Sequence, residues 1–171
     1  MKKYELTAEF IEKWGKKLFR IKALISFGSV EAGELGGYIE KEDNLAHDGN
    51  AWVYGNAEVY GDARVYGNAR VYGNAWVYGN AMVSGNADYL LIGRIGSRFS
   101  FTTFFKNKDK GITVSCGCFL GTIAEFRAKV TDTHGNNKHA KIYNLAADMA
   151  ELQILGEEHF DKLNTNKSEP F

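Results

Sequence analysis

Basic side chains gather in one stretch in the second half of the chain. Positions 94–110 hold one acidic residue, Asp109, and five cations: Arg94, Arg98, Lys106, Lys108 and Lys110. Both arginines lie in the glycine-containing loop 93–98. Farther along the chain, Gly121 leads into a predicted helix start at Thr122. A helix start attracts anions, and guanidinium groups bind phosphate in a bidentate manner. If the loop and the helix start are adjacent, the pair could bind a phosphate.

This pattern defines a candidate ligand site in which a phenylalanine stacks on a base. Its candidate residues are Arg94, Ser97, Arg98, Phe101, Lys106, Phe119, Gly121 and Thr122. The alternative is a solvated hairpin whose lysines protect a sheet edge from aggregation.

Other chemistry-bearing residues form no recognisable catalytic or metal-binding motif. Cys116 and Cys118 lack the C-x2-C spacing of zinc sites, and a disulfide between them would be strained. We expect free, core-packing thiols in a reducing bacterial cytoplasm. His134 and His139 add no metal pattern, and no G-x-S-x-G, P-loop or H-E-x-x-H motif occurs. We therefore predict no catalytic residue, no metal and no cofactor.

Composition restricts the remaining classes of protein. The 171 residues are 44% hydrophobic and 13% aromatic, so a packed core is feasible. With 21 basic and 21 acidic residues, the formal net charge is zero, which argues against a nucleic-acid partner. The first residues lack the apolar region of a signal peptide, and no apolar run is long enough to cross a membrane.

Six consecutive hexads fill positions 49–84: GNAWVY, GNAEVY, GDARVY, GNARVY, GNAWVY and GNAMVS. A fixed period of six is typical of β-solenoids in which each hexad forms one side of a coil. The pattern predicts inward valines and alanines, with glycine and asparagine in the turns. Residues 18 apart should stack, which pairs Tyr54 with Tyr72, Tyr60 with Tyr78, Trp52 with Arg70, and Glu58 with Trp76. This outward aromatic face must be covered by flanking segments or a second subunit, or else it stacks a ligand.

His47 lies just before the first hexad. Aligning Asn44-Leu45-Ala46-His47 with Asn50-Ala51-Trp52-Val53 places His47 in an inward valine slot at the open end of the coils. There we expect it to form capping hydrogen bonds rather than to serve in catalysis.

The segments around the hexads have different textures. Residues 1–36 form a lead-in, with a short helix capped by Thr7 and then a strand over 18–24. The solenoid should occupy 37–90, an α+β domain 91–156, and a frayed polar tail 157–171.

The α+β domain should contain three strands and two helices. Strands are expected at 89–93, 99–105 and 112–118. Thr122 and Glu125 form a capping box for the first helix, and Asn136 or Asn137 caps the second. The apolar stripe of the second helix consists of Ile142, Leu145, Ala146, Met149 and Leu152.

Two blocks, GGYIEKEDNLAHDGNAWVYGNA and GSR…TVSCGCFLGTIAEFRAKV…HGNNKHA, resemble a family of phage and prophage proteins described as hexapeptide-repeat or transferase-like. The resemblance implies a left-handed parallel β-helix with three hexads per coil, hence two coils over positions 49–84. Two or three coils with exposed ends and an aromatic flank would be poorly buried alone, so we predict a homo-oligomer, with a trimer as the family-like choice. Some small oligomeric phage proteins act as sponges that trap nucleotide signals of bacterial immunity, which suggests nucleotide sequestration by analogy.

Three functions therefore remain open. The first is a non-catalytic oligomeric protein that binds a small anionic ligand, such as a cyclic nucleotide or an ADP-ribose derivative. The second is a hexapeptide-repeat acyltransferase that uses His47 or His134, although positions 49–84 contain no histidine and no interrupting loop. The third is a structural protein whose solenoid serves oligomerisation and binds a protein partner.

Overall fold

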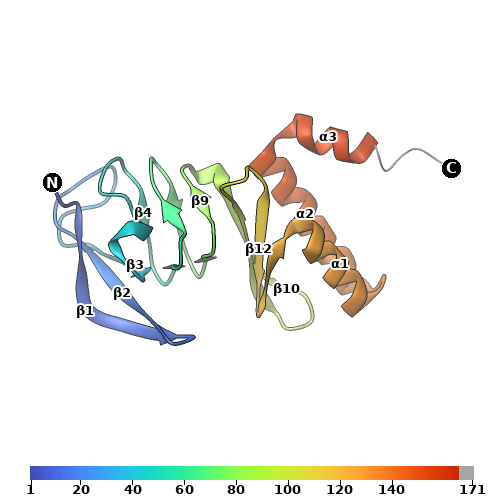
Figure 1. Ribbon diagram of the computed structural model, residues 1–171, viewed down its shortest axis with the longest axis horizontal. Coiled ribbons are helices and arrows are strands. Elements are labelled where there is room, and N and C mark those ends of the chain that lie inside the picture. The colour runs from blue at the N-terminus through green and yellow to red at the C-terminus, as the bar shows by residue number, and fades with distance from the viewer. Residues whose placement is uncertain (166–171) are drawn as a thin grey trace. The chain divides into compact units, whose positions relative to one another are not determined.

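The computed structural model describes the backbone of residues 1–165 and the side chains of residues 1–161 (Figure 1). The chain divides into two units, Met1–Asp88 and Tyr89–Phe171. Within the described residues, no helix is long and apolar enough to cross a membrane.

The first unit contains a stack of coils built from the hexads. Each hexad forms one two-residue strand, in chain order β4 (Trp52–Val53), β5 (Glu58–Val59), β6 (Arg64–Val65), β7 (Arg70–Val71), β8 (Trp76–Val77) and β9 (Met82–Val83). Strands 18 residues apart pair in parallel, giving β4–β7, β5–β8 and β6–β9. All hexad valines and alanines are fully buried, which confirms the predicted inward positions.

The predicted stacking is also confirmed. Tyr54 and Tyr72 have ring centroids 4.4 Å apart, and Tyr60 and Tyr78 have theirs 4.7 Å apart. The turns use left-handed backbone: Gly49 has a φ of 65° and lies directly beneath Gly67. A Cβ atom on Gly49 would lie 2.5 Å from the Gly67 carbonyl oxygen, so close stacking itself requires glycine there.

The first coil is longer than the later ones. Leu45 pairs with Val65, 20 positions on, whereas Val65 pairs with Val83, 18 positions on. The two extra residues lie between Leu45 and Val53, in the corner that contains His47. The expectation that His47 fills an inward valine slot is therefore wrong, because Leu45 fills that slot and is 1% exposed.

The N-terminal lead-in is a β-hairpin rather than a helix followed by a strand. β1 (Tyr4–Lys13) pairs antiparallel with β2 (Lys16–Ala23) around a turn at Trp14 and Gly15. β2 also pairs antiparallel with β3 (Leu35–Ile39), which in turn pairs in parallel with β5. The predicted helix from Thr7 is overturned because its residues pair with β2, while the strand predicted over 18–24 is confirmed.

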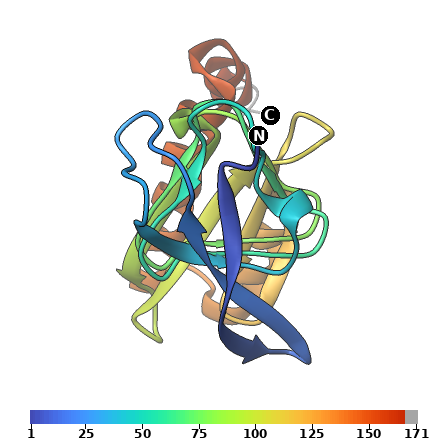
Figure 2. The same ribbon diagram turned by 90° about the vertical axis from the view of Figure 1, so that its left-hand side faces the viewer.

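The hairpin and β3 close the first edge of the stack. Each coil donates its N–H groups to the next coil, as Trp52 does to the Ala69 carbonyl at 3.0 Å, so the carbonyls of the first coil need other donors. Tyr38 of β3 donates to the Ala57 carbonyl, the Tyr4 hydroxyl lies 2.7 Å from the Leu45 carbonyl oxygen, and the Lys3 ammonium lies 2.8 Å from the Ala51 oxygen. In Figure 2 the coils lie one behind another, and the hairpin crosses in front of them.

The same hairpin covers part of the outward aromatic face. Trp14 packs 5.9 Å from the ring of Tyr60 and 5.5 Å from that of Trp76. The Lys13 ammonium lies 2.6 Å from a Glu58 carboxylate oxygen and above the Trp76 ring. Coverage by a flanking segment, one of the predicted alternatives, is thereby confirmed for the stacked pair of strands β5 and β8, which we call a column.

The second unit is a four-stranded antiparallel sheet with helices. The strands follow the order β10 (Tyr89–Ile95), β11 (Ser100–Lys106), β12 (Ile112–Cys116) and β13 (Phe119–Thr122). Three strands were predicted. The fourth arises because β12 ends at Cys116 and the chain reverses at Gly117, whose φ is 60°. Cys118 therefore lies in an exposed turn rather than in the core, while both cysteines are free thiols as predicted.

The helices are α1 (Ile123–His134), α2 (Lys138–Leu155) and α3 (Glu157–Thr165). The predicted caps are confirmed at Thr122 for α1 and at Asn137 for α2. Part of the predicted polar tail, up to Thr165, is helical, and residues 166–171 lie outside the described residues. The core joins Phe104 and Val114 of the sheet to Phe126 of α1 and a face of α2.

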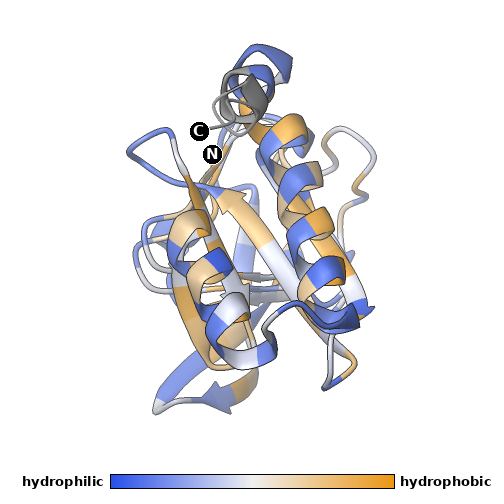
Figure 3. Cartoon of the chain, turned by 90° about the vertical axis from the view of Figure 1, so that its right-hand side faces the viewer, coloured by the Kyte–Doolittle hydropathy of each residue, from blue (hydrophilic) through white to orange (hydrophobic). Residues whose placement is uncertain are grey.

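The predicted apolar stripe of α2 is largely on its outer side. Leu145, Met149 and Leu152 are exposed, and only Ala146 of the stripe is buried outright. The packed face instead carries four alanines with Tyr143 and Ile154; the alanines are Ala140, Ala146, Ala147 and Ala150. Figure 3 shows hydrophobic segments recurring along α2.

Candidate functional site

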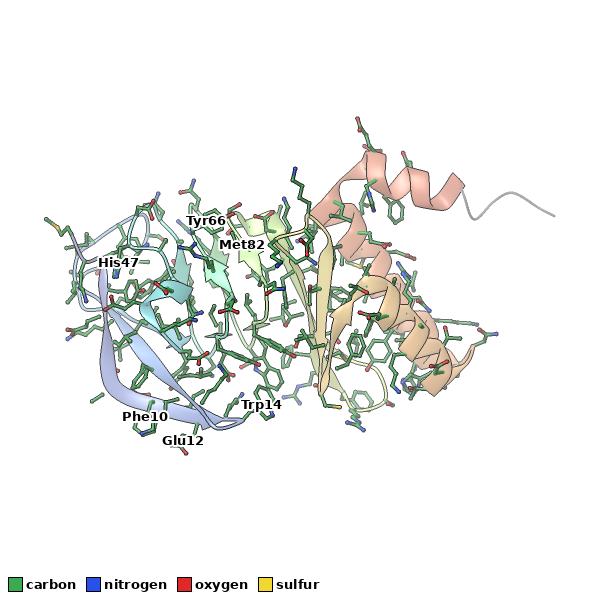
Figure 4. All side chains as sticks on the ribbon, in the orientation of Figure 1. Phe10, Glu12, Trp14, His47, Tyr66 and Met82 are labelled. Atoms are coloured by element: carbon green, nitrogen blue, oxygen red, sulfur yellow. The ribbon has the colours of Figure 1, made fainter. Side chains whose placement is uncertain are left out.

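A pocket with a volume of about 530 Å³ lies on the flank of the first unit. Its walls come from the 3-10 turn η1 (Glu42–Asn44), the enlarged corner 46–48, and the outward side of β6 and β9. Its lining residues are Glu42, Asp43, Leu45, Ala46, His47, Asp48, Arg64, Val65, Tyr66 and Met82. Figure 4 shows His47, Tyr66 and Met82 along one side of the unit, away from Phe10, Glu12 and Trp14 on the hairpin. We call this cavity the His47 pocket.

His47 is held from two sides at the enlarged corner. Its ring stacks on Tyr4 at 4.3 Å, with an angle of 19° between the planes. Its Nδ1 accepts a hydrogen bond from the Lys3 backbone N–H at 3.2 Å. A neutral imidazole whose Nδ1 accepts must carry its proton on Nε2, and Nε2 lies 3.7 Å from a Glu42 carboxylate oxygen. Neutral His47 therefore has no lone pair available to take a proton from a ligand.

Glu42 links the N-terminus to the pocket. Its Oε1 accepts from the Lys2 ammonium at 2.6 Å, and this hydrogen bond holds the pKa of the Glu42 carboxyl below its ordinary value. The carboxyl is therefore ionised at neutral pH and faces the Nε2–H of His47. Glu42 and His47 together form a fixed, polar end wall of the pocket.

Hexad side chains form the remaining wall. Arg64 and Met82 are register partners on β6 and β9, and both precede an inward valine. Alternation along a strand turns both side chains outward, so the wall follows directly from the repeat. Tyr66, next after Val65, is 36% exposed. The wall offers a guanidinium, an aromatic ring and a thioether within one pocket.

The ionisable groups of the pocket are mixed in sign. Glu42, Asp43 and Asp48 are acidic, whereas Arg64 is its one arginine or lysine. Lys2 compensates Glu42, which leaves the two aspartates against Arg64. The pocket can thus accept hydrogen bonds at the aspartates and bind one anionic group at Arg64.

The residues predicted as a ligand site lie in the second unit and are spread over its sheet. Arg94, Ser97 and Arg98 are exposed at the β10–β11 hairpin. Phe101 packs beside Gly93, where an added Cβ would lie 2.1 Å from the ring. Phe119 packs against Phe126 of α1, with ring centroids 5.6 Å apart, and belongs to the core.

Strand register separates the arginine loop from the helix start. Ile95 pairs with Ser100 beside the loop, whereas Thr122 pairs with Thr113 and through it lies level with Phe105. The five residue-to-residue steps from Ser100 to Phe105 span about 17 Å. Lys106 and Gly121 lie toward the Thr122 end as well. The structure therefore joins Arg94, Ser97 and Arg98 but does not bring them to the helix start.

The helix start also holds a carboxylate of its own. Oε2 of Glu125 accepts from the Thr122 backbone N–H at 2.8 Å and from its hydroxyl at 2.9 Å. These hydrogen bonds lower the pKa of Glu125, so the carboxylate is charged where an anionic ligand was expected. Its repulsion disfavours a phosphate at this position.

Two features of the sequence point to the His47 pocket when they are taken together. The 18-residue period already places Arg64 beside Met82 on the outer side of one column. A 20-residue offset would have aligned Leu45 with Val65 and exposed the extra corner residues. Asp43 and Asp48 carried no motif of their own. Among the described residues, no cluster of three or more His, Cys, Asp or Glu side chains could hold a metal ion.

Comparison with known proteins bears on the repeat segment. Residues 63–79 and 75–87 match the sequence profile of a family described as YdcK Beta solenoid repeat. A search of curated proteins found no match. The family match and the parallel columns β4–β7, β5–β8 and β6–β9 together identify the segment as a β-solenoid repeat.

Proposed function

We propose that this protein is a non-catalytic binding protein that holds a small nucleotide in the His47 pocket. The single observation that carries the proposal is this pocket of about 530 Å³, formed where an enlarged corner meets the outward side chains of the repeat. Its volume lies within the range of ordinary small-molecule sites. Nδ1 of His47 already accepts a hydrogen bond from the Lys3 backbone N–H, so neutral His47 carries its proton on Nε2, which argues for binding rather than acid–base catalysis.

The lining supports a ligand with one anionic group and a flat ring. Tyr66 offers an exposed ring for stacking on a base, and Arg64 offers a guanidinium for a phosphate. Asp43 and Asp48 would accept hydrogen bonds from sugar hydroxyls or a base amine. Because Arg64 stands against two aspartates, a singly charged cyclic mononucleotide suits the pocket better than ADP-ribose, which carries two phosphates.

The test is calorimetric titration of the purified chain with cyclic mononucleotides and with ADP-ribose. Removing base stacking with Tyr66→Ala, or the guanidinium with Arg64→Ala, should weaken binding about tenfold or more. Arg70→Ala is the matched control, because Arg70 has the corresponding hexad position on β7 and lies outside the pocket. Loss of binding in Arg98→Ala with retention in Arg64→Ala would move the site to the hairpin and refute the pocket.

The acyltransferase alternative makes an opposite prediction. It requires acyl-CoA turnover that depends on His47 or His134, and such turnover would overturn the non-catalytic proposal. Sequestration of an immune nucleotide signal is the biological role we propose by analogy with phage sponges. If no nucleotide binds and none is released on denaturing protein isolated from host cells, both the ligand class and this role are wrong.

The left-handed turn of the coils is likewise proposed. It is supported by the uninterrupted hexads over 49–84 and by the 18-residue pairing, which makes three hexads one coil as in the left-handed β-helices that the sequence resembles. A crystal structure in which the coils turn to the right would contradict it.

A further inference from the structure

The outer side of α2 carries an apolar stripe that its own unit does not bury. Leu145, Met149 and Leu152 are 63%, 56% and 45% exposed, and Ile142 is half-buried. Their spacing of three, four and three residues is the a/d pattern of a coiled-coil seam over two heptads. Contiguous exposed side chains of this kind mark an interaction surface.

The packing of α2 explains why the stripe points outward. Ala147 and Ala150 are fully buried against the core, and Ala146 is 4% exposed. Small residues let the helix lie close to the sheet, so the large aliphatic side chains are left on the opposite side. The stripe is therefore a consequence of a well-packed inner face, and it remains available to a partner.

We propose that the stripe binds the stripe of a second copy of this chain, with the two α2 helices antiparallel. The spacing reads the same in both directions about position 147. A two-fold axis there places Leu145 against the partner's Met149 and Ile142 against the partner's Leu152. The surface is thus self-complementary, as a two-fold interface requires.

Charge at the two ends of α2 selects the antiparallel direction. Lys138 and Lys141 are exposed in its first turn, and Glu157 and Glu158 are exposed just beyond its last. Antiparallel pairing brings the lysines of one copy to the glutamates of the other at both ends. Parallel pairing would instead place lysine against lysine, and it would align the helix dipoles unfavourably.

A groove beside the stripe widens the contact. A pocket of about 490 Å³ lies between α1 and α2, and its lining includes Asn136, Ala140, Lys141, Asn144, Leu145 and Asp148. Because Leu145 belongs to both the stripe and this groove, a second copy seated on α2 would also contact the groove. The pairing is two-fold and therefore differs from the trimer that the sequence resemblance implied.

Charge exchange provides the decisive experiment. The Lys138→Glu/Lys141→Glu variant should repel its own copies, and so should the Glu157→Lys/Glu158→Lys variant. An equimolar mixture restores opposite charges at both ends. The measurement is analytical ultracentrifugation at low salt, over protein concentrations of about 5 to 500 µM, which cover micromolar dissociation constants. Each variant alone should dimerise at least about tenfold more weakly than wild type. The mixture should recover wild-type dimerisation.

Apolar variants complete the test. Met149→Asp should abolish the dimer, whereas Leu120→Asp, at a 43% exposed position on β13, should leave it intact. The charge variants alter only exposed residues, so they keep the test valid if Met149→Asp fails to fold. A wild-type chain that stays monomeric, a mixture that fails to recover, or an equal effect of Leu120→Asp would each overturn the proposal. Nucleotide binding in the His47 pocket should be unchanged in all these variants.

Discussion

Removal of one hydroxyl should measure how strongly the N-terminal strand closes the repeat stack. Tyr4 is fully buried, and its hydroxyl lies 2.7 Å from the Leu45 carbonyl oxygen and 2.9 Å from that of Glu42. Leu45 belongs to the first coil, which has no preceding coil to donate to its carbonyl. Tyr4→Phe keeps the ring against His47 and Trp52 but removes this donor.

The expected loss of unfolding free energy follows from the burial of the Leu45 carbonyl and from the single proton that the Tyr4 hydroxyl can donate. One hydroxyl proton is lost and a buried carbonyl is left without its donor, which costs about 1–3 kcal/mol of unfolding free energy. Burial raises the pKa of Tyr4 above its ordinary value, so the hydroxyl keeps its proton. The loss of unfolding free energy in Tyr4→Phe should therefore be the same from about pH 6 to about pH 9.

Urea unfolding followed by circular dichroism measures this cost as a lower midpoint with an unchanged slope. The matched control is Tyr66→Phe, because Tyr66 is 36% exposed and its loss of a hydroxyl should cost less than about 0.5 kcal/mol. If both variants lose the same amount, the Tyr4 hydroxyl does not stabilise the edge, and the capping argument fails.

Three further substitutions test other contacts. Burial lowers the pKa of Lys3 from 10.5 to about 8, so between these pH values the unfolded chain binds more protons than the folded chain does. The unfolding free energy of wild type, measured by urea titration, should therefore rise by about 2 kcal/mol from the lower to the higher of these pH values, and this rise should be absent in Lys3→Met. Gly37→Ala would place a Cβ 2.5 Å from the Ala57 carbonyl oxygen, so thermal melts should show a loss of about 1–3 kcal/mol, whereas Gly85→Ala, with space around it, should be tolerated. Arg127→Ala leaves the buried Glu151 carboxylate without its partner at 2.7 Å and should cost about 3 kcal/mol in chemical unfolding, unless Glu151 is removed as well.

The repeat was predictable because every hexad carries the same information. Each valine and alanine is specified by its own position, and neighbouring coils reinforce the choice. His47 was misplaced because its alignment assumed the regular period, while two extra residues lie in the corner between Leu45 and Val53. The printed sequence resumes the hexads immediately at Gly49, so nothing local marks the change.

The flanking elements were less predictable because tertiary contacts decide them. Phe10, Ile11 and Trp14 fit a helical period, yet pairing with β2 and packing of Trp14 on Trp76 make a strand. In α2 the large side chains suggested one buried face, but close approach to the sheet selected the alanines. Local pattern ranks side chains by hydrophobicity, whereas the packed interface also ranks them by size.

The location of the pocket follows from the difference between inward and outward positions of the hexad. A hexad fixes its inward residues and its turn, because a larger inward side chain or a turn without glycine would disrupt the stack. Outward residues that no flanking segment covers are unconstrained, so β6 and β9 can carry Arg64, Tyr66 and Met82 without cost to the fold. A regular stack presents these side chains on a flat flank, and a concave site needs an irregular wall. The enlarged corner supplies that wall, and His47, fixed by Lys3, Tyr4 and Glu42, makes it rigid. Restoring the regular period by deleting His47 and Asp48 should therefore remove the pocket while leaving Leu45 paired with Val65, and calorimetric titration should show that nucleotide binding is lost.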